Sequence, residues 1–290
     1  MTDFEQALSA GPIVMVQLTL PATGADEALP ALADRLKTQV DAFLVGDNPW
    51  ADPRVSPLAA GRLLAERGLT TVVTLTCRDR NRLALASDLL GARALGLNNI
   101  LAVTGVHPRL GPCPGARPVY DLDSVQLLKI IHDMNQGRLP DGRSLETPTH
   151  FFAGAAVNPE ASPPAPGRMK FRLKVSAGAG FLISQAVFHP EKFINLAEEA
   201  GSLGVGLLAG LLVFGPDEVR AVAEGRRPGW HVPPEWLADL RADPDRIVEK
   251  SVSRARETAA ALKGRAAGFL VMAPGLEEQL PGLLPEMDLG

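Results

Sequence analysis

Residues 70–104 read TTVVTLTCRDRNRLALASDLLGARALGLNNILAVT, and their pattern is the best guide to the architecture. The stretch begins with one apolar, β-branched run (70–76) and ends with another (99–104). Between them, residues 81–95 place leucines and alanines at the spacing of one helix face. Runs that are nearly continuous in apolar character are typical of parallel strands buried on both faces. The stretch therefore predicts a strand, a crossover helix and a parallel strand.

The same pattern recurs along the whole chain. Eight short apolar runs are expected to be strands, namely 13–20, 42–45, 70–76, 99–104, 151–157, 181–187, 205–213 and 268–273. Eight segments with 3.6-residue periodicity are expected to be helices, namely 27–40, 57–67, 81–95, 124–134, 168–177, 190–203, 217–224 and 245–262. We expect the strands and helices to alternate strictly, as they do in parallel βαβ units.

Eight such units favour a closed (βα)8 TIM barrel over an open doubly wound sheet. No GxGxxG sequence follows an early strand, which weakens the dinucleotide-fold alternative. We expect residues 1–290 to form a single domain. Its long loops would lie at the carboxyl ends of the strands, where barrel enzymes assemble their sites, and would comprise 105–121, 158–167 and 225–244. The last of these is a candidate lid or subunit contact.

Composition excludes several classes of protein. With 29 basic and 33 acidic residues the net charge is −4, which argues against a nucleic-acid partner. No apolar stretch is long enough to span a membrane, and the acidic start of the chain does not resemble a signal peptide. The two cysteines support neither a disulfide scaffold nor a zinc site, so we expect no metal and a cytoplasmic protein. Aromatic residues are scarce, with ten Phe, three Trp and one Tyr, so we expect a pocket built mainly from backbone, Thr, Gln and Lys.

Polar side chains stand where the apolar strands end. Burial of such groups is unfavourable unless they are hydrogen-bonded or used for binding. The candidates are Gln17, Thr19, Asp47, Thr74, Thr76, Arg78, Thr104, Gly105, Asn158, Glu160 and Gln185. Structural roles are the alternative: the threonines would fill the barrel, Asp79 and Asn81 would cap a helix, and Arg78, Arg80, Glu160 and Lys174 would be solvated. Gln185, on a buried strand, needs a partner, and we expect a ligand contact there.

At these residues the chain resembles a known family, the methylenetetrahydrofolate reductases, particularly their short bacterial forms. The central signature is LTCRDRNRLALASDLLGARALGLNNILAVTG at 75–105. Further motifs that resemble the family are GDNPWADPRVSPLA at 46–59, VYDLDSVQLLK at 119–129, VNPEA at 157–161 and LKVSAGAGFLISQ at 173–185. The resemblance covers nearly the whole chain.

The resemblance implies a barrel with FAD across the carboxyl ends of the strands. NAD(P)H would reduce the flavin, and the flavin would pass a hydride to 5,10-methylenetetrahydrofolate. The product, 5-methyltetrahydrofolate, belongs to one-carbon metabolism and methionine biosynthesis. Residues matched to the flavin site, or expected beside it, are Thr74, Thr76, Arg78, Thr104, Gly105, Tyr120, Asn158 and Lys174. The folate or related pterin would contact Gln17, Asp47 and Gln185.

Four positions depart from the family pattern. Gln17 stands where the family has the glutamate that acts as general acid, and an amide has no proton to deliver near pH 7. Val106 replaces an aspartate beside the flavin, Thr74 stands where histidine is common, and Gly154 stands where some members have tyrosine. The usual contacts to the flavin would therefore be weakened.

Three interpretations follow from these departures. The protein is a divergent reductase whose proton comes from water or from a substitute such as Glu160, Asp47 or His107. Alternatively, it is a pterin-binding paralogue with another one-carbon substrate or without tightly held flavin. In the third interpretation it is a catalytically silent subunit of a larger one-carbon complex. A corrinoid methyltransferase on the same barrel would need no flavin but lacks sequence support. We expect a homo-oligomer or a subunit of such a complex.

Overall fold

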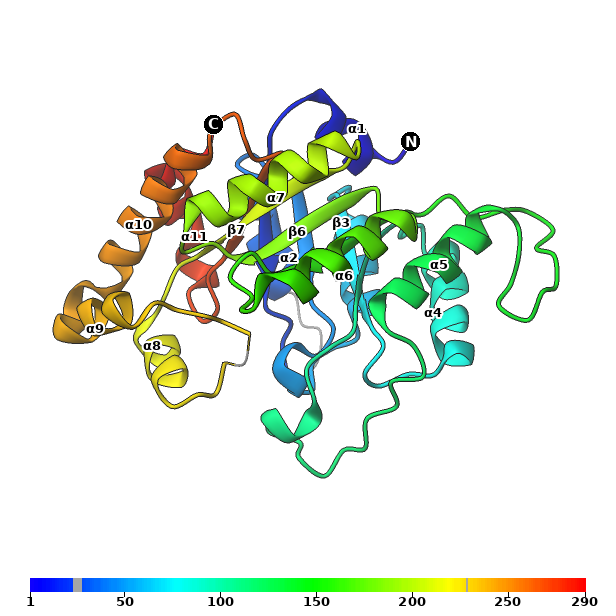
Figure 1. Cartoon of the computed structure of the whole chain (residues 1–290), viewed down its shortest axis with the longest axis horizontal. Coiled ribbons are helices and arrows are strands. Elements are labelled where there is room, and N and C mark those ends of the chain that lie inside the picture. Colours follow the sequence, from blue (N-terminus) through cyan, green and yellow to red (C-terminus); the bar gives the residue numbers. More distant parts are fainter. Residues whose placement is uncertain (23–27, 228) are drawn as a thin grey trace.

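The eight apolar runs form a closed parallel barrel in the computed structural model, which describes residues 1–22, 28–227 and 229–290 (Figure 1). Each strand pairs with its sequence neighbours, and the last strand pairs with the first. The strands are β1 Ile13–Leu18, β2 Ala42–Val45, β3 Thr71–Thr76, β4 Asn99–Val103, β5 Phe152–Val157, β6 Phe181–Ala186, β7 Gly206–Leu212 and β8 Gly268–Met272. The expected TIM barrel is confirmed, and the expected strand ends are correct to within two residues.

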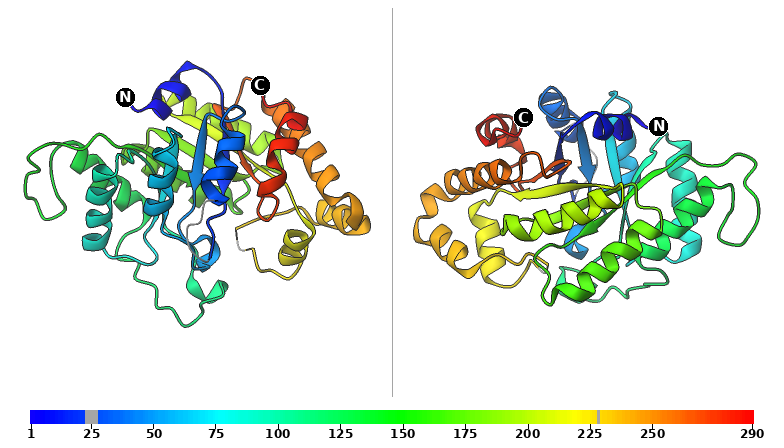
Figure 2. Two further views of the ribbon diagram at one scale, coloured as in Figure 1. Left: turned by 180° about the vertical axis from the view of Figure 1, so that it is seen from behind. Right: turned by 45° about the horizontal axis from the view of Figure 1, so that its top comes forward.

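Helices surround the barrel and alternate with the strands (Figure 2). They are α1 Asp3–Ala10, α2 Ala28–Leu36, α3 Pro57–Ala65, α4 Arg82–Ala94, α5 Ser124–Asn135, α6 Pro164–Ser176, α7 Pro190–Ser202, α8 Pro216–Ala223, α9 Pro234–Ala242, α10 Ile247–Leu262 and α11 Leu280–Leu283. The expected first residue of the helix at 27–40 lies outside the described residues. None of the helices in the described ranges is long and apolar enough to cross a bilayer.

Two apolar layers hold the barrel together. The outer layer lies between the strands and the helices, and the inner layer fills the barrel with side chains such as Met15, Val72 and Ile183. Phe4 of α1 closes the amino-terminal end, where its ring contacts the rings of Phe152 and Phe181 at centroid distances of 5.9 and 5.0 Å. One end of the barrel is therefore sealed by aromatic packing, which leaves the opposite end for a site.

The helices differ from expectation in several places, and α2, expected to reach residue 40, ends at Leu36. α1 was not predicted. The helices expected at 217–224 and 245–262 are α8 and α10, and both lie between β7 and β8. The expected strict alternation was therefore wrong there. The short helix α11, which follows β8, was not predicted either. α6 begins at Pro164 and α9 at Pro234, inside the expected loops 158–167 and 225–244. Proline-rich sequence usually indicates a loop. Proline is nevertheless tolerated in the first turn of a helix, because the N–H groups there have no hydrogen-bond acceptor within the helix.

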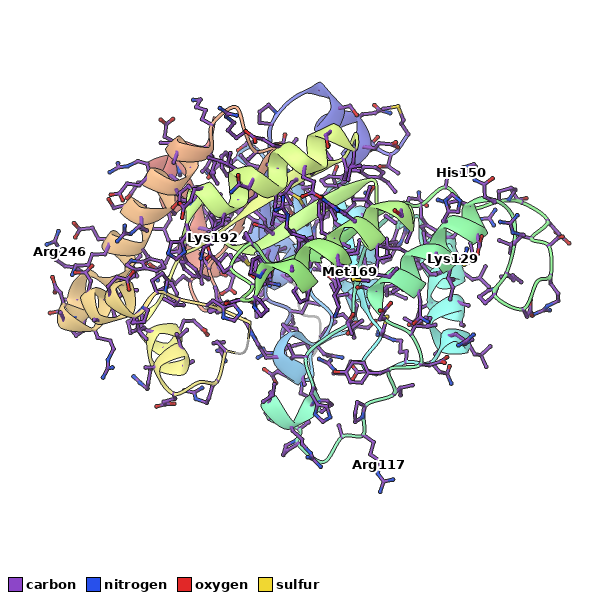
Figure 3. All side chains as sticks on the ribbon, in the orientation of Figure 1. Arg117, Lys129, His150, Met169, Lys192 and Arg246 are labelled. Carbon is purple, nitrogen blue, oxygen red and sulfur yellow. The ribbon has the colours of Figure 1, made fainter. Side chains whose placement is uncertain are left out.

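The segment 105–121 projects from the end of the molecule opposite to the two chain termini (Figures 1 and 2). It contains a single 3-10 turn, Pro108–Leu110, and Arg117 lies at its tip (Figure 3). This segment follows β4, so it marks the carboxyl end of the barrel.

Candidate functional site

A cavity of about 420 Å³ opens at the carboxyl end of the barrel, within the range of small-ligand pockets. Its lining follows from strand geometry, because residues two apart on a strand face the same side. Along β1 the inward series runs from Met15 to Gln17, and along β6 it runs from Ile183 to Gln185. The inward side chains thus change from apolar to polar as each strand approaches this end.

Ten of the twelve residues predicted for the site line this cavity. They are Gln17, Asp47, Thr74, Thr76, Arg78, Thr104, Gly105, Asn158, Lys174 and Gln185. The two that do not line it are Glu160 and Tyr120. Residues up to 168 positions apart in the chain are therefore brought together, because every parallel strand ends at the same face.

Asp47 is the centre of a buried ion-pair network at the rim. Its carboxylate accepts hydrogen bonds from the Thr76 backbone N–H at 2.8 Å and from Arg80 Nη1 at 2.5 Å. Arg80 also pairs with Asp88 at 2.8 Å. The alternative in which Arg80 is a solvated surface charge was therefore wrong, because its partners hold it against the body of the barrel. Asp47 already has these partners, which makes it a poor substitute for the family's acid.

Arg78 is likewise buried, with 3% of its side chain exposed, so the solvated reading of this residue was also wrong. Its guanidinium donates to both oxygens of Asp79 and to the carbonyl oxygens of Asn48 and Val106. Burial opposes ionisation of Asp79, but the hydrogen bonds from Arg78 outweigh it and lower the pKa of Asp79. Asp79 is thus a partner of Arg78. Asn81 does cap α4, accepting from the Ala84 N–H at 3.0 Å.

Gly105 packs its backbone tightly against Thr76. Its φ of +87° lies in the left-handed region, and a Cβ at this position would collide with the Thr76 hydroxyl. Tyr120 donates its hydroxyl to the Gly105 carbonyl at 3.3 Å. The tyrosine therefore braces the loop from outside the cavity lining, whereas the sequence predicted a place beside a flavin. Thr104 lies nearby and accepts from the Ser124 N–H at 3.1 Å.

Lys174 reaches the cavity from α6 and is not a solvated surface lysine. Its Nζ donates to the Ala156 carbonyl of β5 at 2.6 Å. Burial, followed by the like charge of Lys170, lowers the pKa of Lys174 to about 8, while Asp123 acts in the opposite sense. The ammonium therefore remains protonated at pH 7. Since a single carbonyl uses one of its three donors, two N–H groups are available for a ligand.

Gln17 and Gln185 bring two amides to the cavity from β1 and β6. Among the described residues, neither side chain has a hydrogen-bond partner in the protein. The partner that Gln185 was predicted to need is thus not supplied by the described protein residues. Asn158 differs, because its Oδ1 accepts from the Glu160 N–H at 2.9 Å.

Glu160 was expected to be exposed, but 3% of its side chain is accessible. Its carboxylate accepts from the backbone N–H groups of Phe188 and His189, from Lys192 Nζ at 2.9 Å, and contacts His189 Nδ1 at 2.8 Å. Burial raises its pKa, but these hydrogen bonds prevail and lower it. Glu160 therefore ties β5 to the start of α7, and its ionised state near pH 7 makes it a poor proton donor. Lys192 is labelled in Figure 3.

Two further expectations concern groups near the rim. His107 does not line the cavity, and its Nδ1 accepts from the Arg109 N–H at 3.2 Å. Gly154, where some family members have tyrosine, lies against the Phe181 ring, which a side chain at this position would strike.

No cluster of three or more His, Cys, Asp or Glu residues that could hold a metal ion occurs in the described part of the chain.

Trp50 and Trp230 also line the cavity, and sequence reasoning missed both. The scarcity of aromatic residues suggested a pocket built from backbone, Thr, Gln and Lys. Two of the three tryptophans nevertheless reach the site, from the segment after β2 and from the expected lid 225–244. The motif GDNPWADPRVSPLA contained a signal, since a tryptophan in a polar, proline-rich loop has no strand or helix face to bury it.

Comparison with solved structures agrees with the barrel. A protein from Clostridium thermocellum, described as binding two copies of 5-methyl-5,6,7,8-tetrahydrofolic acid, superposes with a TM-score of 0.70 at 14% identity, covering 99% of this chain and 98% of that one. DmoA from Hyphomicrobium sulfonivorans superposes at 0.56 with 10% identity, covering 96% and 88% of the two chains. At these identities the likeness extends to the fold alone.

Sequence comparison is more specific. A relative from Caenorhabditis elegans, named a probable methylenetetrahydrofolate reductase (NADPH), is 26% identical over 68% of this chain and 29% of its own length. The chain thus spans less than a third of that relative. The family model described as "Methylenetetrahydrofolate reductase" matches residues 24–265, which include every residue that lines the cavity except Gln17, Thr19 and four residues near β8. The chain belongs to the methylenetetrahydrofolate reductase family.

Proposed function

We propose that the protein is a flavin-dependent reductase that converts 5,10-methylenetetrahydrofolate to 5-methyltetrahydrofolate with electrons from NAD(P)H. The observation that carries this proposal is the cavity itself. A member of this family has here, at the open end of the barrel, a cation, Lys174, and two amides, Gln17 and Gln185, that have no hydrogen-bond partner among the described residues. The amides suit the ring of a pterin, and the cation suits a phosphate.

The residues present fit FAD. Lys174 has two N–H donors available for the diphosphate, while Thr74, Thr76 and the backbone around Gly105 line the adjoining wall. When bound, the flavin would accept electrons from NAD(P)H and supply a hydride to the folate. The protein would hold the two ring systems in contact and exclude water, and positioning of this kind contributes a large part of catalysis.

The pterin would be oriented by the amides at opposite sides of the barrel. Gln185, at the family's pterin position, would offer a donor and an acceptor to the pyrimidine edge, and Gln17 would lie on the other side of the ring. A carboxylate free to donate a proton is missing from the described lining, because Asp47 is held by Arg80 and Thr76. Water would therefore provide the proton that the family takes from glutamate.

The same deficit favours a second candidate, a folate-binding paralogue that has lost turnover. The cavity retains the amides for the pterin but lacks the acid that opens the methylene bridge. In this case the protein would act on another one-carbon substrate or serve as a silent subunit of a complex.

The decisive experiment is a single turnover. The purified protein is reconstituted with FAD, reduced under anaerobic conditions with NADH or NADPH, and mixed with 5,10-methylenetetrahydrofolate while flavin absorbance is followed. The reductase predicts reoxidation of the flavin and formation of 5-methyltetrahydrofolate. A protein that binds the folate without reoxidising the flavin would be the paralogue. A protein that takes up no flavin would contradict the reductase.

The pH dependence of FAD affinity tests the role of Lys174. Since the pKa of Lys174 is about 8, its charge is present below pH 8 and is lost as the pH rises through that value. FAD should therefore bind about tenfold more tightly at pH 7 than at pH 9.5, as expected for a charge-assisted hydrogen bond worth about 1.5 kcal/mol or more. Binding is measured by quenching of flavin fluorescence.

The matched controls use two lysines of the same helix. Lys174→Met should weaken FAD binding at pH 7 and abolish the pH dependence of FAD affinity. Lys170→Met, which removes an exposed lysine outside the cavity lining, should keep a pH dependence but move it to higher pH, because the like charge of Lys170 lowers the pKa of Lys174. An unchanged pH profile in Lys174→Met would show that this ammonium does not contact the diphosphate.

A further inference from the structure

The backbone around Trp50 is held in an unusual conformation. Asn48, Trp50 and Ala51 have φ values of 46°, 53° and 59°, in the left-handed region that residues other than glycine rarely adopt. Conformations of this kind cost about 1–3 kcal/mol each and persist only where the surroundings impose them. Their clustering at binding sites makes such a segment a candidate for function.

Neighbouring residues impose the bend. The Asn48 side chain accepts from the Arg54 N–H at 2.9 Å, and the Asn48 carbonyl accepts from the Ala51 N–H at 3.0 Å. Gly111, from the projecting segment 105–121, approaches so closely that a Cβ there would collide with the Trp50 carbonyl. The strained turn is thereby fixed on two sides, and it places the Trp50 side chain in the lining of the cavity.

A second tryptophan completes an aromatic wall, by which we mean Trp50 and Trp230. The two rings meet edge to face at a centroid distance of 5.2 Å and an angle of 86°. Arg227 lies over the Trp50 ring with its guanidinium carbon 4.4 Å from the centroid, and Glu218 pairs with the same guanidinium at 2.5 Å. Because Glu218 neutralises Arg227, the wall offers the cavity an aromatic surface without a free charge.

The wall and the residues matched to flavin occupy different parts of the cavity. Trp50 follows β2 and Trp230 precedes β8, so both lie on the side of β1, whose penultimate residue is Gln17. The residues matched to flavin lie on or after β3, after β4 and after β5, with Lys174 added from α6. A flavin and a pterin in contact with each other would therefore each have one of these two groups on its outer side.

We propose that Trp50 and Trp230 form the binding wall for the pterin ring of the substrate and that the Arg227–Glu218 pair fixes this wall in place. The inference rests on the proposed function for its substrate class. The pyrimidinone half of a tetrahydropterin is flat and presents a π face, and nucleic-acid bases of similar size stack on aromatic side chains with about 1–3 kcal/mol per base. Flavin offers the same ring chemistry, so the test must distinguish the two ligands.

The experiment measures binding, without turnover. The probes are 5-methyltetrahydrofolate, p-aminobenzoylglutamate, which lacks the pterin, and FAD, each titrated into wild type, Trp50→Leu, Trp50→Phe and Trp230→Leu while Kd is determined by calorimetry. Trp236→Phe is the matched control, because Trp236 packs on Phe214 and does not line the cavity. Urea unfolding of each variant verifies that the fold is intact.

We expect Trp50→Leu and Trp230→Leu to raise the Kd for 5-methyltetrahydrofolate by about 5- to 100-fold, which corresponds to the loss of one stacking contact. Trp50→Phe should retain part of the affinity, and Trp236→Phe should retain all of it. FAD and p-aminobenzoylglutamate should change less than twofold. Folded leucine variants that bind 5-methyltetrahydrofolate like wild type would overturn the proposal, and so would a loss confined to FAD, which would assign the wall to flavin.

Failure of the proposed function is a separate result. A protein that shows no turnover but binds 5-methyltetrahydrofolate in a tryptophan-dependent way would support the aromatic wall and contradict the proposed reductase activity. Turnover with the same KM in Trp50→Leu as in wild type would support the reductase activity and contradict the role of the aromatic wall. A wild type that binds no 5-methyltetrahydrofolate would remove the wall.

Discussion

Substitution of Asp47 by Asn should lower the free energy of unfolding by about 3 kcal/mol, at the low end of the range for breaking a buried ion pair. The Asp47 side chain is fully buried, and its carboxylate holds Arg80 and the Thr76 N–H together. An asparagine still accepts from Thr76 but leaves Arg80 without its closest counter-charge. Asp88 retains a contact to Arg80 and limits the loss.

Urea unfolding followed by circular dichroism measures this change. Asp217→Asn is the matched control, because the same chemical change is made in a side chain that is 91% exposed and lies 3.5 Å from Arg220. Exposed pairs contribute about 0–1 kcal/mol, so the control should unfold like wild type. Equal stability of the two variants would mean that the Asp47 network contributes nothing beyond a surface pair.

The same network shows why part of the site could not be predicted. The strands were predictable because apolar runs such as 70–76 are buried on both faces, and the carboxyl ends of parallel strands must meet. Nine predicted residues line the cavity for that reason, and Lys174 joins them from α6. Whether Arg80 is solvated or paired depends on Asp47, which lies 33 positions away and follows another strand. No local pattern carries this information.

The tryptophans illustrate a second limit. Trp50 reaches the cavity through a left-handed turn braced by Gly111, and Trp230 reaches it from a segment of 20 residues, 225–244, in which α9 was also missed. Periodicity describes regular elements and says nothing about such loops. Phe4 was missed similarly, because α1 is short and its single buried residue makes no stripe. Contacts made by irregular segments depend on the completed barrel.

Gln17→Glu should increase the rate of the half-reaction with methylenetetrahydrofolate by about 100-fold or more, the usual contribution of a general acid. Gln17 pairs in register with Leu44 on β2 and Met272 on β8, and all three line the cavity. A carboxyl group introduced between these apolar neighbours would be partly desolvated, which raises its pKa and keeps a proton available near pH 7. The expected gain therefore depends on surroundings that are already apolar.

Single-turnover reoxidation of the reduced flavin measures the gain between pH 6 and 9. The rate of Gln17→Glu should fall as the pH rises through the pKa of the new carboxyl, because only the protonated form donates, whereas wild type should lack that step. Gln185→Glu is the control in the same cavity: it adds the same group at the pterin position, and we expect no gain. A Gln17→Glu variant that folds, binds folate and reacts no faster would show that the missing acid is not what limits this site, and would favour the silent paralogue.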